Sequence, residues 1–158
     1  SIQISDIKDF MSHLLSKDTF DHFYFIEASI KMGVSYQIQG RINEGFYDTS
    51  VEQTLNREFC YWKEIRHRIF DIIKGKRLPL SCKIVLGLSK QSISYLIAHN
   101  NSSFREEDIE GIYVNILYDP KNLLITTGIS YKNFSLDKSL EYAFDEYLAK
   151  FLKEKAVI

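Results

Sequence analysis

Residues 51–79, near the middle of the chain, hold the longest apolar pattern of helical period. Apolar side chains recur there at spacings of three and four residues, which is typical of one face of an α-helix. The members of this stripe are Leu55, Phe59, Trp62, Ile65, Ile69 and Ile72 or Ile73. The pattern predicts a long central helix in which Trp62 is a buried anchor.

Capping residues mark both expected ends of this helix. Ser50 is suited to the N-cap position, and Gln53 completes a capping box with it. Gly75 suits the position after the last turn, where a left-handed backbone conformation is common, and Pro79 prevents the helix from resuming. We therefore expect the helix to begin after Ser50 and to end before Gly75.

Runs rich in β-branched and aromatic residues on both sides of this helix predict strands. Residues 22–31 and 34–42 flank Met32-Gly33 and are typical of a β-hairpin that needs a three-residue connection. Residues 110–118 and 123–131 flank a second turn, in which Pro120 takes the position that type I turns favour. The remaining predictions are strands at residues 2–4 and 80–88 and helices at residues 7–15, 90–98 and 136–153.

Both halves of the chain thus run in the order strand, helix, hairpin, helix. Aligning Gly40 with Gly128 brings residues 20–48 onto residues 108–136 without a gap, and Phe46 then falls on Phe134. We interpret residues 1–79 and 80–158 as an internal repeat, with convergence on one pattern as the alternative. The predicted fold is α+β: one domain, residues 1–158, in which two tandem strand–helix–hairpin–helix units form an antiparallel sheet with helices packed on it.

Composition narrows the classes of protein that fit this pattern. A chain of 158 residues with 45% hydrophobic content builds a sizeable core, which excludes a disordered protein. The formal net charge of −1 gives no global attraction to nucleic acid, so any electrostatic function must be local. Two cysteines without a C-x-x-C motif are expected to be buried free thiols in a reducing, cytoplasmic compartment. No apolar run approaches the roughly 18 residues of a membrane span, so we expect no membrane partner.

The first candidate surface is the basic end of the central helix. It comprises Arg66, Lys74, Lys76 and Arg77. One interpretation is that these four side chains complement the helix dipole, because cations are favoured near a helix C-terminus. The alternative is a ridge that binds anions or nucleic acid.

The second candidate surface is the face of the first hairpin opposite the core. Strict alternation along the two strands places Phe25, Gln37, Gln39 and Arg41 on this face, together with Glu27. An ordinary solvated face with a Glu27–Arg41 ion pair is one interpretation. The other is a binding surface whose amides and arginine contact a polar partner.

Short catalytic motifs are missing from the sequence. There is no nucleophile elbow with a Ser/His/Asp order, no dinucleotide-binding fingerprint and no Cys/His cluster with metal spacing. We therefore expect neither a metal nor a cofactor, and we favour a non-enzymatic binding or adaptor module with a protein or nucleic-acid partner. The alternative is a small-molecule sensor or an enzyme with a pocket between the sheet and the central helix. A cavity near Trp62 would favour this alternative, whereas a solid core with a continuous basic ridge would favour the first hypothesis.

Several stretches resemble a domain-of-unknown-function family of short bacterial proteins. They are SDIKDFMSHLL, EASI, IKGKRLPLSCKIVLGLS and FSLDKSLEYAFDEY, and the resemblance spans nearly the whole chain. That family has no assigned activity, so the resemblance implies no site residues. The tandem units also resemble, in architecture alone, the repeats of sliding DNA clamps. Clamp repeats continue with further strands, whereas here a long helix is expected after each hairpin, and likeness of fold is weak evidence of function.

Overall fold

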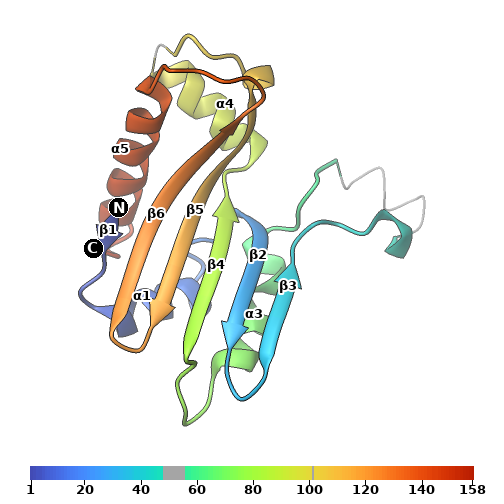
Figure 1. Cartoon of the computed structure of the whole chain (residues 1–158), viewed down its shortest axis with the longest axis vertical. Helices are drawn as coiled ribbons and strands as arrows, with labels where there is room; N and C mark the ends of the chain where they lie inside the picture. Colours follow the sequence, from blue (N-terminus) through green and yellow to red (C-terminus); the bar gives the residue numbers. More distant parts are fainter. Residues whose placement is uncertain (48–55, 101) are drawn as a thin grey trace.

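A six-stranded antiparallel sheet forms the centre of the computed structural model, which describes residues 1–47, 56–100 and 102–158 (Figure 1). Along the sheet the strands lie in the order β1-β6-β5-β4-β2-β3, each antiparallel to its neighbours. Their bounds are β1 Ile2–Gln3, β2 Tyr24–Lys31, β3 Ser35–Gln39, β4 Ser81–Gly87, β5 Ile109–Asp119 and β6 Asn122–Tyr131.

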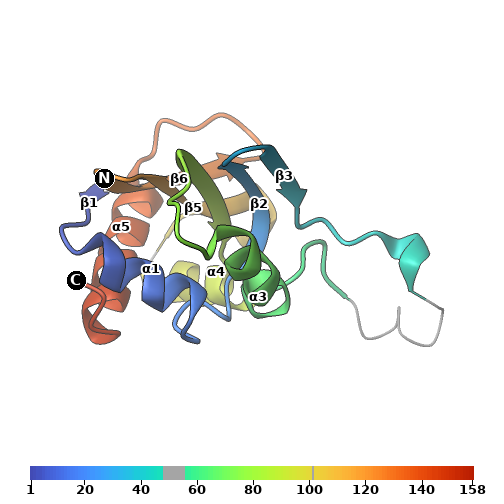
Figure 2. The ribbon, with the colours of Figure 1, turned by 90° about the horizontal axis from the view of Figure 1, so that it is seen from below.

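The described residues form four α-helices, which lie on one face of this sheet (Figure 2). They are α1 Ile7–Leu15, α3 Trp62–Ile73, α4 Lys90–His99 and α5 Ser139–Glu154, with short 3-10 turns η1 Glu44–Phe46 and η2 Glu106–Asp108. Because side chains alternate along each strand, one face of the sheet collects the apolar residues that pack under the helices. Fully buried examples are Ile30, Ile84, Leu86, Ile112, Val114, Ile116 and Ile125. The predicted α+β class is therefore confirmed, and no described helix covers the opposite face, called here the open face.

Both predicted hairpins are present with the expected connections. In the first, Lys31 pairs with Ser35, which leaves a three-residue turn. In the second, Asp119 pairs with Asn122, and the Asp119 carboxylate accepts backbone N–H groups of Lys121 and Asn122 at 2.8 and 2.9 Å. The side chain of Asp119 thus holds the turn that its sequence predicts.

The central helix is shorter than its apolar stripe predicts. Helix α3 begins at Trp62, and residues 56–61 before it are not helical, with isolated β-bridges at Phe59 and Tyr61. The predicted cap at Ser50 and the stripe residue Leu55 lie outside the described residues. The C-terminal end is as expected, because Lys74 caps the helix and Gly75 follows with a φ of +138°.

Backbone pairing explains why residues before Trp62 are not helical. The N–H of Cys60 donates to the carbonyl of Gly40 at 2.9 Å, and the carbonyl of Cys60 accepts the N–H of Phe25 at 2.8 Å. Segment 58–61 therefore lies between the start of β2 and the chain that leaves β3. A Cβ at Gly40 would overlap the carbonyl oxygen of Phe25, so this close approach requires glycine.

The two halves keep the same order of elements but not the same sheet pairing. β4 pairs with both β2 and β5, whereas β1 pairs with β6 and not with β2. A two-fold repeat would give β1 and β4 equivalent neighbours. The matched glycines also differ, because a Cβ at Gly128 would meet nothing within 4 Å. The strand order therefore does not support the predicted tandem repeat.

Candidate functional site

A cleft of about 550 Å³ opens between the helices, where four segments of the chain meet. These segments are the loop after α1, the start of α3, the start of α4 and the end of α5. Polar side chains reach the cleft from every one of them: His22, Lys63, Ser89, Ser92, Tyr147 and Lys155. The volume lies within the range of ordinary small-molecule sites.

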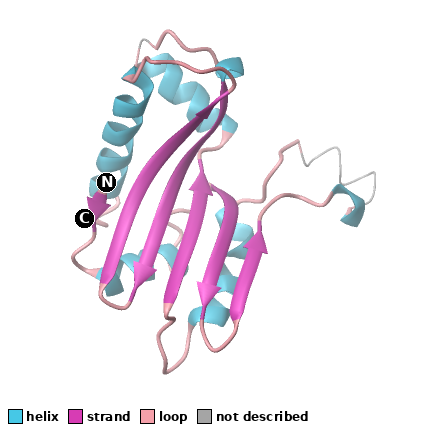
Figure 3. Ribbon diagram, in the orientation of Figure 1, coloured by secondary structure: helices cyan, strands magenta, loops and turns pink. Residues whose placement is uncertain are grey.

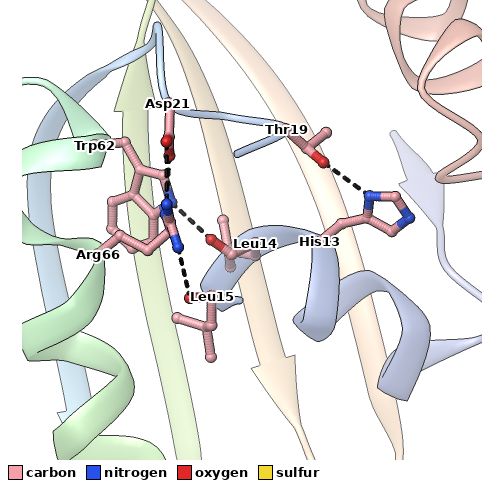
Figure 4. Close-up of polar contacts among 7 residues, drawn as sticks. All are labelled: His13, Leu14, Leu15, Thr19, Asp21, Trp62 and Arg66. Atoms are coloured by element: carbon pink, nitrogen blue, oxygen red, sulfur yellow. Dashed lines mark hydrogen bonds and ion pairs between the residues drawn. The ribbon is translucent and has the colours of Figure 1, made fainter. Parts of the chain in front are cut away.

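One wall of the cleft is the loop of residues 16–23, and Arg66 of α3 anchors it (Figure 4). Nε and Nη2 of Arg66 donate to the two carboxylate oxygens of Asp21 at 2.9 and 3.1 Å, and Nη1 donates to the carbonyl of Leu15 at 3.3 Å. The Arg66 residue is 8% exposed. A bidentate pair of this kind fixes the orientation of the carboxylate as well as its position.

Trp62 anchors the end of α1, from which the same loop leaves. Its indole Nε1–H donates to the carbonyl of Leu14 at 2.7 Å, and the residue is fully buried (Figure 4). The last carbonyls of an α-helix have no partner within the helix, so α3 satisfies one of the terminal acceptors of α1. The ring also packs on Phe25, with centroids 5.7 Å apart. Trp62 is therefore the buried anchor that the sequence predicts.

His13 of α1 contacts the middle of the same loop. Its Nδ1 lies 2.8 Å from the Thr19 hydroxyl oxygen, and its Nε2 lies 3.8 Å from a carboxylate oxygen of Asp9 (Figure 4 shows the Thr19 contact). Arg66 and His13 thus hold the loop through Asp21 and Thr19, while Trp62 holds the end of α1 that precedes it. The wall of the cleft is thus formed before any ligand enters.

The start of α3 places an aromatic ring and a cation at the cleft. Glu64 accepts the backbone N–H of Tyr61 at 2.7 Å and pairs through both oxygens with Arg57, also at 2.7 Å. The hydrogen bonds from Arg57 hold the pKa of the Glu64 carboxyl below its usual range. Arg57 in turn lies over the Tyr61 ring, 4.5 Å from its centroid, and the Lys63 ammonium is 5.9 Å from the same ring.

The start of α4 contributes hydroxyl groups and a helix N-terminus. The Ser89 hydroxyl accepts the backbone N–H of Ser92 at 3.2 Å and donates to the Ser92 hydroxyl at 3.1 Å. Ser89 is thus the N-cap of this helix. The positive end of the helix dipole therefore faces the cleft.

The end of α5 closes the remaining side. Phe151 meets Phe20 and Phe23 edge-to-face, with centroids 5.8 and 5.4 Å apart. Burial raises the pKa of Tyr147, and a hydrogen bond with Ser92 partly opposes this effect. Lys155 follows the helix as its C-cap residue.

The electrostatic balance of the cleft favours an anion. Lys63 and Lys155 line it, whereas the charge of Asp21 is compensated by Arg66, which leaves Asp18 as the opposing carboxylate. Within the residues that the structure describes, no group of three His, Cys, Asp or Glu side chains is placed to hold a metal ion. Both cysteines are free, and burial raises the pKa of each thiol to about 11, so neither is an activated nucleophile.

The predicted basic ridge is not continuous. Arg66 is buried against Asp21, which corrects the expectation that it lies on the outer face of the helix. The reason is its spacing of four residues from Trp62, which puts both side chains on the inner face. Lys74 is exposed and paired with Asp71 at 3.0 Å, while Lys76 and Arg77 are exposed on the loop that follows.

The residues predicted to share one face of the first hairpin do not all lie on the same face of the sheet. Phe25 faces the helices and is fully buried, because a bulge between Phe25 and Glu27 shifts the alternation of β2 by one residue. Gln37 and Gln39 do lie on the open face, and Gln37 donates to the Ser29 hydroxyl at 2.9 Å.

Arg41, the remaining residue of that set, pairs with Glu58 and not with Glu27. Its guanidinium also lies over the Phe59 ring, 5.1 Å from the centroid. Glu58 and Phe59 belong to the non-helical segment before α3, so this arginine ties that segment to the chain leaving β3.

Sequence reasoning missed the cleft because its walls come from four separate segments. Ser89 carried the single local signal, since a capped helix start offers free N–H groups to a ligand. Its neighbours in space, such as Lys63 and Lys155, carry no signal in the sequence around them.

None of the helices in the described part of the chain is long and apolar enough to cross a membrane. Comparison with curated proteins and with solved structures finds no match. A family model with the description "Family of unknown function (DUF5721)" matches residues 13–158. The match covers nearly the whole chain and confirms the resemblance seen in the sequence: the protein belongs to DUF5721, a family of unknown function.

Proposed function

We propose that the protein is a binding module that holds a small organic anion in the cleft between its helices. The observation that carries this proposal is the convergence of Lys63, Lys155 and the start of α4 on one cleft of about 550 Å³. Polar groups that converge from separate elements on a preformed cavity are the usual sign of a small-molecule site. The anchored loop of residues 16–23 supports the same idea, because a rigid wall lowers the entropic cost of binding.

The lining indicates what kind of anion fits. Phe23, Tyr61 and Phe151 offer aromatic surface to the body of a ligand, while the two lysines suit a carboxylate or phosphate group. The hydroxyls of Ser92 and Tyr147 add hydrogen-bonding groups. A flat or cyclic organic acid, or a small phosphorylated metabolite, matches this combination.

This proposal keeps the binding role expected from the sequence and changes the class of partner. A continuous basic ridge would have favoured the protein or nucleic-acid hypothesis, and the burial of Arg66 removes one member of that ridge. The alternative hypothesis expects a pocket between the sheet and the central helix, near Trp62. The cleft of this proposal instead lies between the helices, beside the start of α3, and Trp62 belongs to the solid core. Two free cysteines support a reducing compartment such as the cytoplasm. The role that fits best is a non-enzymatic sensor or carrier.

The test is a thermal-unfolding screen of the protein against inorganic phosphate, nucleoside monophosphates, dicarboxylates and aromatic carboxylates. We expect at least one organic class to raise Tm with concentration, since a ligand that binds only the folded state adds about 2.7 kcal/mol at a hundred times its Kd. Lys63→Ala and Lys155→Ala should each weaken the shift. Lys150→Ala removes an exposed lysine of α5 outside the cleft lining and should leave the shift unchanged.

A variant that blocks the cleft distinguishes binding in the cleft from long-range effects of removing a lysine charge. Gln91 is exposed at the cleft, so Gln91→Trp fills the opening without disturbing the core. Loss of the ligand shift in Gln91→Trp, with unchanged Tm of the free protein, supports binding in the cleft. A panel in which no compound raises Tm, or a shift that survives both lysine variants and Gln91→Trp, contradicts the proposal.

A further inference from the structure

One end of the sheet gathers three turns, at the bottom of Figures 1 and 3. They connect β2 to β3, α3 to β4, and β5 to β6. The connection between α3 and β4, residues 74–80, projects farthest from the body and is called here the tip loop. Its sequence is Lys-Gly-Lys-Arg-Leu-Pro-Leu.

The tip loop exposes two leucine side chains to solvent. Leu78 is 67% exposed and Leu80 is 70% exposed. Val34, in the turn between β2 and β3, is 65% exposed. The two turns are adjacent, because the backbone N–H of Leu80 donates to the carbonyl of Lys31 at 2.8 Å. Three aliphatic side chains therefore stand out from one end of the molecule.

The backbone holds these leucines outward. Gly75 turns the chain sharply away from α3 with a φ of +138°, and the N–H of Lys74 still bonds to the carbonyl of Phe70 at 2.8 Å. Pro79, between the two leucines, is buried against the body. The loop is thus fixed at both ends, and its leucines cannot fold back into the core without breaking these contacts.

Cations surround the exposed leucines. Lys76 and Arg77 precede Leu78 in the tip loop, and Lys31 and Lys83 lie close to the same end of β2 and β4. Of the carboxylates at this end, Asp71 pairs with Lys74, while Asp119 accepts backbone N–H groups in its own turn and keeps its charge. A chain with a net charge of −1 therefore presents a locally basic end.

We propose that this end of the molecule docks on the surface of an anionic lipid bilayer. Leu78 and Leu80 enter the boundary between headgroups and acyl chains, and the neighbouring cations contact lipid phosphates. The sequence predicts no membrane partner because it contains no spanning run, but surface docking requires none. This inference is independent of the ligand proposed for the cleft.

The shape and chemistry of the tip loop favour a lipid surface over other anionic partners. A peptide that docks as a helix needs a groove, and residues 74–80 line none of the five best-formed cavities in the described part of the chain. Single-stranded nucleic acid is held by aromatic stacking, and the tip loop contains no aromatic residue. Exposed aliphatic side chains gain nothing from a phosphate backbone, whereas they gain by leaving water at a bilayer.

The experiment is co-sedimentation of the full chain with vesicles of phosphatidylcholine alone and of an equimolar mixture with phosphatidylglycerol. One variant, Leu78→Ser with Leu80→Ser, keeps the cations. A second, Lys76→Gln with Arg77→Gln, keeps the leucines. The control, Phe134→Ser with Leu136→Ser, removes apolar side chains that are 90% and 81% exposed outside the three turns. All these positions are exposed, so each variant is expected to fold, which circular dichroism checks.

We expect binding to the mixed vesicles and none to neutral ones. Loss of two cations should lower the partition coefficient about 30-fold, since each basic residue near an anionic surface contributes about 1 kcal/mol. Loss of the two leucines should lower it about tenfold or more, and the control should bind like the wild type. Failure of the wild type to bind mixed vesicles overturns the proposal. Vesicle binding that survives loss of the leucines also overturns it. So does duplex DNA binding that depends on Lys76 and Arg77 with no vesicle binding, which would assign this end to nucleic acid.

Discussion

The two long helices that end the halves of the chain, α3 and α5, lie on the same face of the sheet but are held there by different forces (Figure 2). α5 buries an apolar stripe of Leu140, Phe144, Leu148 and Leu152, each almost fully removed from water. α3 buries three side chains, of which one is an arginine and another is a tryptophan with a polar hydrogen-bond donor. Its inner face therefore carries less apolar surface and more directional chemistry.

Polar contacts show the same division. From α3, Trp62 bonds to the carbonyl of Leu14 and Arg66 pairs with Asp21. On α5, Asp145 accepts a hydrogen bond from the Thr127 hydroxyl of β6 at 2.6 Å, in an exposed position. The sheet beneath the two helices differs as well. The edge strand on the α3 side, β3, has five residues, whereas β5 and β6 have eleven and ten. The comparison teaches that a helix with little apolar area to bury is positioned by buried hydrogen bonds, which also makes it sensitive to single substitutions.

The largest effect should come from Trp62→Ala. It removes a fully buried ring and leaves the Leu14 carbonyl without its donor, so the free energy of unfolding should fall by roughly 3–5 kcal/mol. Trp62→Phe keeps most of the ring and loses the hydrogen bond, which should cost about 1–3 kcal/mol. Urea unfolding of both variants separates packing from hydrogen bonding. Equal losses in the two would show that the hydrogen bond, and not the ring, dominates.

A somewhat smaller loss is expected from Arg66→Met. The methionine fills the space but leaves the Asp21 carboxylate buried without its partner, which should cost about 3 kcal/mol. Adding Asp21→Leu removes that carboxylate and should restore much of the stability. On α5, Asp145→Ala is the matched test of an exposed polar contact and should change stability by less than about 1 kcal/mol. If Arg66→Met is as harmless as Asp145→Ala, the buried pair does not position α3.

The smallest effect in this series distinguishes the two hairpins through their aligned glycines. Gly40→Ala forces a methyl group against the Phe25 carbonyl and should cost about 2–3 kcal/mol as the backbone shifts. Gly128→Ala meets open space and should lie within about 0.5 kcal/mol of the wild type. Thermal unfolding of the pair tests whether the first hairpin alone depends on a close backbone approach. Similar costs at both positions would bring back the idea of equivalent hairpins.

Much of the fold follows from local pattern, because both hairpins, the order of elements and the helix exit at Gly75 depend on neighbouring residues. Two departures have physical causes that local pattern does not contain. Phe59 fits the spacing of a helical stripe, yet its segment is not helical because its backbone groups pair with two separate parts of the sheet. Phe25 changes face because a single inserted residue in β2 reverses the alternation.

The candidate site was harder to predict than the fold. Arg66 looked like a surface cation, although its spacing from Trp62 already put it on the inner face. The partner that makes its burial favourable, Asp21, is far away in the sequence and carries no sign of the pairing. The cleft depends on four such long-range meetings, so it becomes visible once tertiary structure brings the segments together.

The pairing of β1 with β6 has a consequence for how the chain folds. Ile2 pairs with Ile125, so one edge of the sheet joins residues separated by most of the sequence. Closing so long a loop costs conformational entropy before the pairing of β1 with β6 contributes any stability. The hairpin of β5 and β6 closes locally, so its entropy cost is smaller. The hairpin should therefore form early and serve as the template onto which β1 docks last. Hydrogen exchange after brief refolding should show protection of β6 on its β5 side before protection of Ile4, whose N–H bonds to the carbonyl of Leu123.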